Sequence, residues 1–217
     1  MTDLSIISLA DVWLVLGALG GYQLYLQHKS VNRERYCEGF IKRLQYLLGV
    51  PALGSLFVFL ADPDQLSFVF IELPRGAETA GIVLFNGAAL IILWSHLVLG
   101  RHWSGDLETL SDHQLVNSGP YSLVRHPLYS SYLFLTAGFL LMTENWLVST
   151  MMFVYFLAVA ARARTEEEML ATRIGAEYRA YCARTPRFLP SVGRVWDHAR
   201  SALGPRLDHV KSHLSVF

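Results

Sequence analysis

Charged residues are scarce in this sequence, and cysteines are nearly absent. Only 17% of the 217 residues are Asp, Glu, Lys or Arg, whereas 53% are hydrophobic, and the mean hydropathy is +0.33. A soluble domain of this size is usually more charged, so the composition argues against one. The two cysteines, Cys37 and Cys182, lack the spacing of metal ligands, and no metal site is expected.

The hydrophobic residues are concentrated in five long runs. A helix rises about 1.5 Å per residue, so a run of about 20 apolar residues crosses the hydrocarbon core of a bilayer. The last two runs are shorter, but Tyr, Trp and Arg at their flanks can complete the crossing. Lipid offers no partner for unpaired backbone groups, so each run is predicted to be a helix. The runs are residues 12–26 (extended by residues 4–9), 44–60, 80–100, 127–142 and 146–161.

Lys and Arg are almost absent from one set of connecting segments. The chain before residue 12 and the turn at residues 143–145 contain neither, and the segment 61–78 contains only Arg75. With five spans, the other 17 of the 18 basic residues fall on the opposite side. The positive-inside rule makes that side cytoplasmic. We therefore expect an integral protein of the inner (cytoplasmic) membrane, with its N-terminus outside and its C-terminus in the cytoplasm.

The N-terminal residues and the cysteines predict neither a cleaved signal peptide nor a structural disulfide. Residues 1–10 carry Asp3 and no Lys or Arg, so they lack the basic region of a cleaved signal peptide, and none is expected. Both cysteines fall on the predicted cytoplasmic side, where a structural disulfide is not expected.

Polar and small residues inside the runs predict contacts between helices. Asn86, Ser95 and His96 lie in the third run, and such groups usually face the interior of a bundle. We expect them to form hydrogen bonds between helices. Gly17 and Gly21 have the small-xxx-small spacing that is typical of close helix packing.

The first polar segment of interest on the predicted cytoplasmic side is residues 112–129. Gly119-Pro120 is a turn signal, and Pro127 fits the first turn of the fourth helix. The turn and the proline place His126 and Tyr129 at the start of that helix, where a ligand can bind. Arg, His and Tyr at this depth are also typical of interfacial anchors, and the residues alone favour that interpretation.

The second polar segment follows the fifth run. Helical spacing places Tyr155, Arg162 and Glu166 on one face. One interpretation is a snorkelling Arg followed by a solvated acidic turn, residues 166–168. The other is an Arg–Glu pair that holds a ligand at the mouth of the helix bundle. The residues alone leave both open.

Together, the two segments resemble the isoprenylcysteine carboxyl methyltransferase family. The first motif is Gly-Pro-Tyr-x-x-x-Arg-His-Pro-x-Tyr at residues 119–129, and the second is Arg-x-x-x-Glu-Glu at residues 162–167. The spacing Gly-x-x-Tyr-x-x-Tyr at 175–181 and the stretch 186–190 also match, although Ile174 stands where the family commonly has an aromatic residue. The resemblance covers about residues 95–190. Both motifs in this order, separated by a helical hairpin, are strongly specific for the superfamily.

The resemblance implies an all-α integral membrane enzyme with about five transmembrane helices and a cytoplasmic C-terminal cofactor-binding region. It implies transfer of a methyl group from S-adenosylmethionine to a lipophilic acceptor, by resemblance a carboxylate such as that of an isoprenylcysteine. Arg162 would contact the acceptor and form the catalytic pair with Glu166. A further cofactor contact within residues 103–106 is not assigned. The other cofactor contacts would be His113, Gln114, Leu115, Val116, Tyr121, His126, Pro127, Leu128, Tyr129 and Glu166.

The expected organisation has three regions. Residues 1–95 supply helices for anchoring and packing, residues 96–190 form the methyltransferase-like catalytic region, and residues 191–217 form a basic cytoplasmic tail. The expected partners are the lipid bilayer and the methyl acceptor, with no nucleic acid and no metal.

Two other functions remain open. Membrane sterol reductases that use NADPH resemble the family at their C-terminal end, but they tend to have Asn after the Arg-His pair, so Pro127 favours methyl transfer. A non-enzymatic accessory protein would use the same polar loops as partner surfaces. The identity of the methyl acceptor and the oligomeric state are also open.

Overall fold

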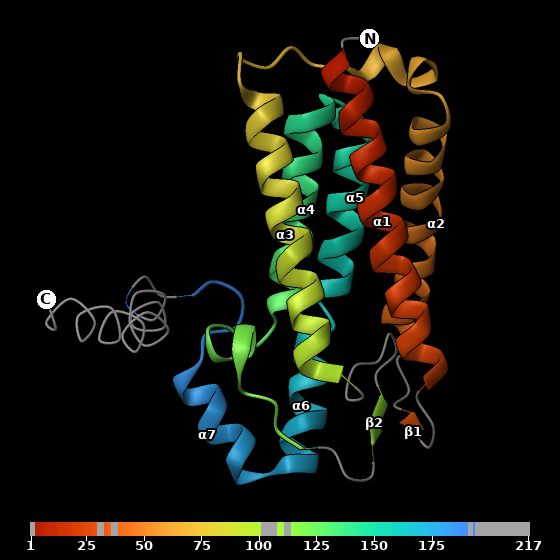
Figure 1. Ribbon diagram of the computed structural model, residues 1–217. Helices are drawn as coiled ribbons and strands as arrows, with labels where there is room; N and C mark the ends of the chain where they lie inside the picture. Colours follow the sequence, from red (N-terminus) through yellow and green to blue (C-terminus); the bar gives the residue numbers. More distant parts are fainter. Residues whose placement is uncertain are drawn as a thin grey trace, which may run out of the picture.

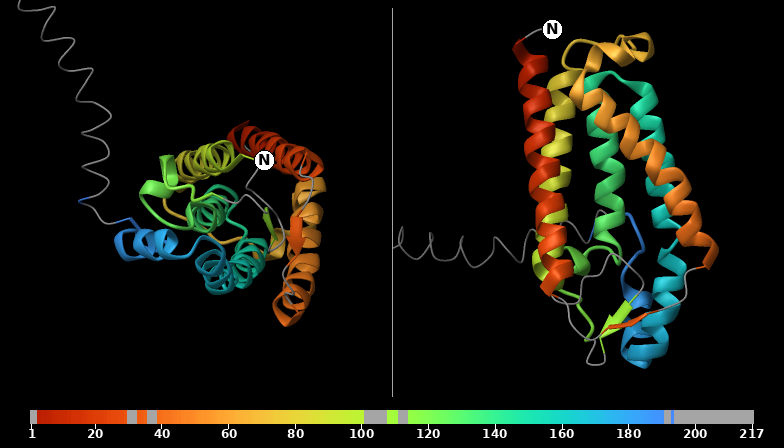
Figure 2. Two further views of the ribbon diagram at one scale, coloured as in Figure 1. Left: turned by 90° about the horizontal axis from the view of Figure 1, so that it is seen from below. Right: turned by 90° about the vertical axis from the view of Figure 1, so that its right-hand side faces the viewer.

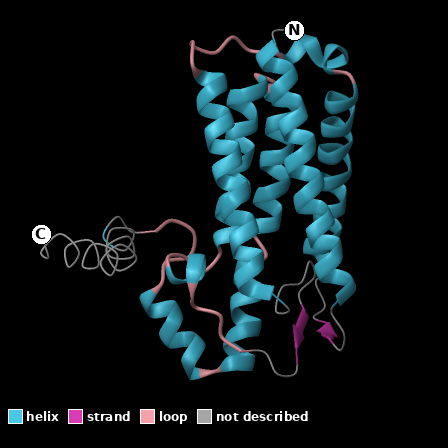
Figure 3. Ribbon diagram, in the orientation of Figure 1, coloured by secondary structure: helices cyan, strands magenta, loops and turns pink. Residues whose placement is uncertain are grey.

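The computed structural model describes residues 3–29, 33–35, 39–100, 108–110, 114–190 and 193. This part of the chain is almost entirely helical (Figures 1 and 3). All five apolar runs are confirmed as helices, with boundaries close to the predicted ones. The helices are α1 (Asp3–Lys29), α2 (Gly39–Ala61), α3 (Ala77–Leu99), α4 (Pro127–Thr143) and α5 (Trp146–Ala160).

The length and composition of the helices fit a membrane. Lys42–Ala61, Ala77–Leu99 and Trp146–Ile174 are long and apolar enough to cross one, and α4 is a shorter apolar helix. Large apolar side chains point outward from the bundle, for example Leu47 (72% exposed) and Leu90 (66% exposed). An apolar outer surface of this kind is suited to lipid. The chain is therefore an integral membrane protein, as its composition predicts.

The two ends of the bundle differ in character. One end contains the C-terminal ends of α1, α3 and α5 and the beginnings of α2 and α4, with α6 (Ala163–Ile174) and α7 (Ala176–Arg184) beyond them (Figure 1). We call this the basic end, because the connecting segments of the sequence that are rich in Lys and Arg adjoin it. The opposite end holds the N-terminus, the 3-10 helix η1 (Pro63–Val69) and the α4–α5 turn.

A short antiparallel pair of strands departs from the all-α expectation. β1 (Arg33–Arg35) pairs with β2 (Glu108–Leu110) at the basic end, in the register Glu34 opposite Thr109. Both strands lie in connecting segments, outside the apolar runs. The pair links the α1–α2 connection to the segment that follows α3.

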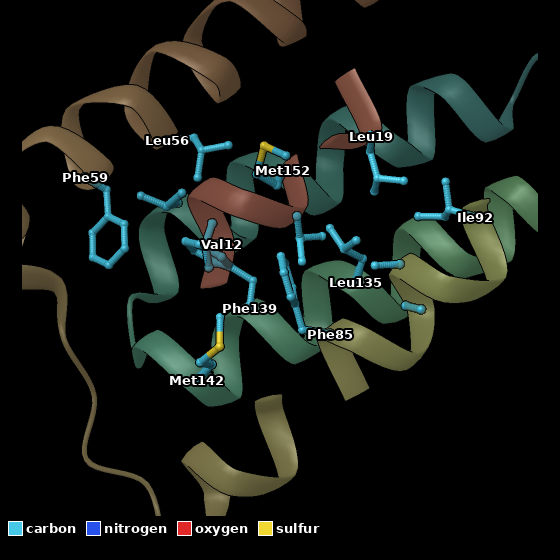
Figure 4. Packing of buried hydrophobic residues seen from close by; sticks show 14 of the residues in the cluster. Val12, Leu19, Leu56, Phe59, Phe85, Ile92, Leu135, Phe139, Met142 and Met152 are labelled. Atoms are coloured by element: carbon cyan, nitrogen blue, oxygen red, sulfur yellow. The ribbon is translucent and has the colours of Figure 1, made fainter. Parts of the chain in front are cut away.

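The closest helix packing is between α3 and α4. A Cβ atom added at Gly138 would lie 2.6 Å from the backbone nitrogen of Phe85, and one added at Gly81 would lie 2.5 Å from that of Met142. Only glycine lets two backbones approach this closely. α5 packs against α4, α2 against α5, and α1 against α3 (Figure 2). Figure 4 shows the apolar core, where Val12 of α1 meets Phe85 and Phe139.

The hydrogen bonds of the buried polar groups confirm part of the interhelical expectation. Asn86 Nδ2 donates to Asp11 Oδ2 at 2.6 Å, and His96 Nε2 lies 3.5 Å from Gln23 Nε2, so both link α3 to α1. Ser95 Oγ donates to the carbonyl of Ile91 within its own helix.

The glycine pattern in α1 has a different role from the one predicted. A Cβ atom added at Gly17 or Gly21 would meet nothing within 4 Å, so the expectation of close helix packing there is wrong. α1 and α2 are joined near the opposite end, where Trp13 Nε1 donates to the carbonyl of Leu60 at 3.3 Å. They diverge toward the basic end (Figure 2, right). The glycine face therefore borders open space.

The α3–α4 contact gives a direct test of this packing. Gly138→Ala places a methyl group against the Phe85 backbone, so we expect a loss of about 1–3 kcal/mol in the free energy of unfolding. Thermal unfolding of the detergent-purified protein measures this loss. Gly21→Ala is the matched control, because its new methyl group meets open space, and it should not destabilise the protein. Equal destabilisation by both substitutions would contradict the packing.

Candidate functional site

The first polar motif forms a turn at the basic end that leads into α4. Gly119 has a φ of +56°, which favours glycine, and a Cβ atom there would lie 3.0 Å from the Val98 side chain of α3. The 3-10 helix η3 (Gly119–Ser122) follows. Pro127 occupies the first turn of α4, as predicted, and His126 immediately precedes it. His126 is 6% exposed, so the turn holds the imidazole inside the protein.

The carboxylate of Glu167 joins three parts of the chain. Its Oε1 atom lies 2.9 Å from His126 Nε2 and 3.0 Å from an Nη of Arg125, and its Oε2 atom lies 2.6 Å from an Nη of Arg187. A carboxylate only accepts hydrogen bonds, so His126 Nε2 carries the hydrogen. Burial raises the pKa of Glu167, but the hydrogen bonds from His126 and Arg187 and the charge of Arg125 outweigh it and lower the pKa to about 2.

The segment that contains Arg187 is also fixed through its backbone. The carbonyls of Pro186 and Arg187 accept hydrogen bonds from the backbone N–H groups of Arg125 and His126, at 2.9 and 3.0 Å. The carbonyl of Phe188 accepts one from Ser130 Oγ at 2.6 Å. Residues 186–188 therefore lie directly along the turn before α4.

Glu166 contacts the other side of the same imidazole. Tyr129 Oη donates to Glu166 Oε2 at 2.8 Å, and the same oxygen lies 3.8 Å from His126 Nδ1. The Tyr129 ring stacks on the His126 ring, with centroids 5.3 Å apart and an interplanar angle of 12°. Glu167 therefore holds His126 by a hydrogen bond at Nε2, while Glu166 lies near Nδ1 without a hydrogen bond to it.

Two tyrosines of α7 complete the polar end of the site. Tyr181 Oη donates to the carbonyl of Tyr121 at 2.6 Å, and Tyr178 is buried beside it. Burial raises the pKa values of Tyr121, Tyr178 and Tyr181, so all three hydroxyls stay protonated at physiological pH. α7 is thereby attached to the turn of the first motif.

A cavity of about 870 Å³ opens among these residues. His113 and residues 103–106 lie outside the described residues. Every predicted site residue that the structure describes lines the cavity, so the two motifs, which are distant in the sequence, meet here. These residues are Gln114, Leu115, Val116, Tyr121, His126, Pro127, Leu128, Tyr129, Arg162 and Glu166.

The cavity continues from the polar end into the helix bundle. Its inner walls come from α1, α2, α4 and α5, and they include Leu16, Leu53 and Phe57. It reaches Trp13 and Leu60, the residues that join α1 and α2. The first two helices, for which the sequence predicts anchoring and packing, therefore also line the site. They carry no recognisable motif, so only the structure identifies them as cavity walls.

The described residues contain no cluster of three His, Cys, Asp or Glu side chains that would hold a metal ion. Arg162, which is 7% exposed, lines the cavity together with Glu166 and Tyr155, the two residues expected on its face. The fold and the site thus define an α-helical membrane protein whose polar end shares one cavity with its apolar interior.

Residues 80–172 match the model of the isoprenylcysteine carboxyl methyltransferase (ICMT) family. A solved structure, that of the eukaryotic intramembrane Ras methyltransferase ICMT, has a similar fold. Its TM-score is 0.52 at 18% sequence identity, over 83% of this chain and 61% of that chain. The resemblance to this family that the motifs predict is confirmed, over the segment that carries them.

Curated relatives match part of the chain. The chain is 39% identical over 96 residues to the cobalt-zinc-cadmium resistance protein CzcN of Cupriavidus metallidurans, which covers 43% of this chain and 44% of the relative. It is 31% identical over 114 residues to the nickel-cobalt-cadmium resistance protein NccN of Alcaligenes xylosoxydans xylosoxydans. That match covers 52% of this chain and 50% of the relative. It is 34% identical over 83 residues to the protein-S-isoprenylcysteine O-methyltransferase of Schizosaccharomyces pombe. That match covers 37% of this chain and 35% of the relative. The match thus spans half or less of each relative.

The Glu167 contacts predict a specific effect on stability. Glu167→Gln removes the charge that pairs with Arg125, His126 and Arg187, so we expect a loss of about 1–3 kcal/mol in the free energy of unfolding at pH 7. Because the folded pKa of Glu167 lies below the ordinary value of 4.5, its stabilisation is present above pH 4.5 and is lost as the pH falls toward 2. The stability difference from wild type should narrow over that window.

Thermal unfolding at several pH values measures this difference. Glu168→Gln is the matched control, because Glu168 is the exposed neighbour on the same helix, and it should change stability little. If Glu168→Gln destabilised the protein as much as Glu167→Gln, the central role of Glu167 would be wrong.

Proposed function

We propose that this protein is a membrane methyltransferase that uses S-adenosylmethionine and methylates a lipophilic acceptor. The observation that carries the proposal is the single cavity that joins a polar, motif-bearing end to an apolar interior. A polar cofactor and a lipophilic acceptor can meet in such a cavity. The match of residues 80–172 to the model of a methyltransferase family supports the same chemistry.

The residues at the polar end suit this cofactor. Glu166 presents a carboxylate to the cavity, which suits the cationic amino group of the cofactor, and Tyr121 and Tyr129 offer aromatic surface for its adenine or sulfonium. When bound, S-adenosylmethionine supplies an electrophilic methyl group on a sulfonium sulfur, which departs as a neutral thioether. We assign cofactor binding to the expected cofactor contacts that line the cavity, and also to His113, which precedes Gln114 in the sequence.

Arg162 suits the orientation of an acceptor. Its guanidinium is buried in the wall of the same cavity, where a planar fork of donors can hold a carboxylate in one orientation. A carboxylate is already ionised and nucleophilic at pH 7, so it needs placement rather than a general base. Placement of the two reactants in line can contribute about 7–11 kcal/mol to the reduction of the barrier.

The charge distribution supports a topology for this enzyme. We propose that the basic end lies in the cytoplasm, with the N-terminus outside, because 17 of the 18 Lys and Arg residues then fall on the cytoplasmic side. The cofactor would then enter from the cytoplasm. Residues 96–190 would form the catalytic region, residues 1–95 would provide the anchoring helices and the apolar wall, and residues 191–217 would form a basic tail.

Substitution of the two central residues separates their proposed roles. Glu166→Gln should weaken S-adenosylmethionine binding about 10- to 100-fold, because it removes one charge-assisted contact. Arg162→Ala should reduce turnover of the acceptor with a smaller effect on cofactor binding. Equilibrium binding and initial rates with labelled S-adenosylmethionine measure both effects. Arg164→Ala and Glu168→Gln, which change exposed residues on the same helix, are controls. Full binding and turnover in both site variants would refute the site assignment.

Labelling identifies the type of reaction. Membranes that contain the protein are incubated with methyl-labelled S-adenosylmethionine, and the labelled lipid product is isolated. We expect a base-labile label, which indicates a methyl ester, whereas a stable linkage would indicate a nitrogen or sulfur acceptor. Binding of NADPH in place of S-adenosylmethionine would favour the reductase alternative. Binding of neither would favour an accessory protein.

A further inference from the structure

A hydrogen-bonded pair of side chains, Gln23 of α1 and Tyr132 of α4, lines the cavity beside the site residues. Gln23 Nε2 donates to Tyr132 Oη at 2.6 Å and lies 3.5 Å from His96 Nε2. His96 Nδ1 lies 2.8 Å from the carbonyl of Ile92, which only accepts, so Nδ1 carries the hydrogen. Because His96 is fully buried, its ring is neutral and its Nε2 atom accepts. This fixes the amide of Gln23 with its NH2 group toward His96 and Tyr132.

This arrangement leaves one donor and one acceptor of the pair unused. An amide nitrogen only donates, so Tyr132 Oη accepts from Gln23, and the hydroxyl hydrogen takes no part in that bond. Apart from the contacts above, the two side chains make no hydrogen bond with the described residues. Gln23 Oε1 therefore has no partner there, yet it is not one of the solvent-inaccessible polar atoms without a partner. The Oε1 atom is thus accessible to a small molecule, and its residue lines the cavity.

The unused donor and acceptor are close enough to bind a single oxygen atom. The nitrogen and oxygen of an amide lie about 2.2 Å apart, because the C–N and C=O bonds are about 1.33 and 1.23 Å long. Gln23 Oε1 and Tyr132 Oη therefore lie at most about 4.8 Å apart, given the 2.6 Å bond between the two side chains. A hydroxyl oxygen about 2.8 Å from each can accept from Tyr132 and donate to Gln23. A carboxylate only accepts, so Gln23 Oε1 would repel it.

The pair lies where the cavity changes from polar to apolar. Tyr132 is three residues beyond Tyr129 on α4, which places it about 4.5 Å deeper in the bundle. About one turn deeper still, the lining is apolar, with Leu135 on α4 and Leu19 on α1. A ligand hydroxyl that enters this part of the cavity loses its hydrogen bonds to water. Gln23 and Tyr132 can replace them, so the pair favours a ligand that carries a hydroxyl at this depth.

We propose that Gln23 and Tyr132 form a subsite that binds a hydroxyl group of a ligand in the cavity. The inference rests on the proposed function, and it adds α1 to the helices that select the ligand. The hydroxyl belongs to the ribose of S-adenosylmethionine or to the methyl acceptor, and the two arms of the experiment separate these sources. It is a bound group and not the methylated one, because neither an amide oxygen nor a protonated phenol is a base that removes its proton.

Matched variants and matched ligands test the subsite together. Tyr132→Phe removes the donor but keeps the ring that stacks on Phe156, and Gln23→Met removes the acceptor. Tyr22→Phe is the control, because Tyr22 precedes Gln23 on α1 but does not line the cavity, and its ring contact with His96 is kept. Equilibrium binding is measured with the full chain in detergent.

The experiment has two arms. The cofactor arm compares S-adenosylhomocysteine, the product of methyl transfer from the cofactor, with its 2′-deoxy and 3′-deoxy analogues. The acceptor arm compares 2-hydroxyhexadecanoic and 3-hydroxyhexadecanoic acid with hexadecanoic acid, in the presence of S-adenosylhomocysteine. Within each arm the ligands differ only in a hydroxyl group, so a difference in affinity measures the binding of that group.

We expect the wild type to bind a hydroxylated ligand of one arm about 10-fold more tightly than its counterpart without that hydroxyl. Tyr132→Phe and Gln23→Met should each reduce this preference to about twofold or less. In Tyr132→Phe the affinity for the counterpart should stay within about twofold of wild type, because variant and analogue remove the same contact and their effects do not add. Tyr22→Phe should keep the wild-type preference. A preference in the cofactor arm assigns the subsite to the ribose, and one in the acceptor arm assigns it to the acceptor.

Three results would overturn the inference. The first is a wild type without a hydroxyl preference in either arm, which would mean that the pair holds only a water molecule. The second is a preference that persists in both Tyr132→Phe and Gln23→Met, and the third is one that Tyr22→Phe abolishes equally. A wild-type protein that binds neither S-adenosylmethionine nor S-adenosylhomocysteine refutes the proposed function itself, which separates that failure from a failure of the hydroxyl subsite.

Discussion

The Glu167 carboxylate is the contact on which the arrangement of the site depends. It is partly buried, and burial alone disfavours its charge. Arg125, His126 and Arg187 compensate with contacts of 2.6–3.0 Å. These partners come from the turn before α4 and from the segment after α7, whereas Glu167 lies on α6. Removal of the Glu167 charge would leave its three partners without their shared carboxylate. Glu167 therefore holds the three segments together as a unit.

This arrangement explains how a polar site is maintained at the end of an apolar bundle. His126 is held by Glu167 at one ring nitrogen and lies near Glu166 at the other, and Tyr129 stacks on its ring. The orientation of these side chains therefore follows from hydrogen bonds rather than from the helices alone. The helices supply the apolar remainder of the cavity, because α3 and α4 pack through glycines while α1 and α2 diverge.

The sequence predicts well those features that depend on local pattern. The five helices follow from apolar runs, the start of α4 follows from Pro127, and the meeting of the two motifs follows from family resemblance. Contacts between distant residues leave no such pattern. The pairing of Glu167 with Arg187, for example, depends on how the segment after α7 folds back on α6. The glycine spacing in α1 misleads for the same reason, since spacing alone does not show whether a helix lies opposite.

The one-sided distribution of basic residues has a second physical consequence. Cations that set topology must lie at one end of a membrane protein, and there they also create a positive potential. Three of the basic residues at this end are partly or fully buried, namely Arg125, Arg162 and Arg187. A cation in such a place needs an anion nearby. Glu167 provides one for both Arg125 and Arg187, so a carboxylate is needed at the same end of the bundle that the basic residues occupy.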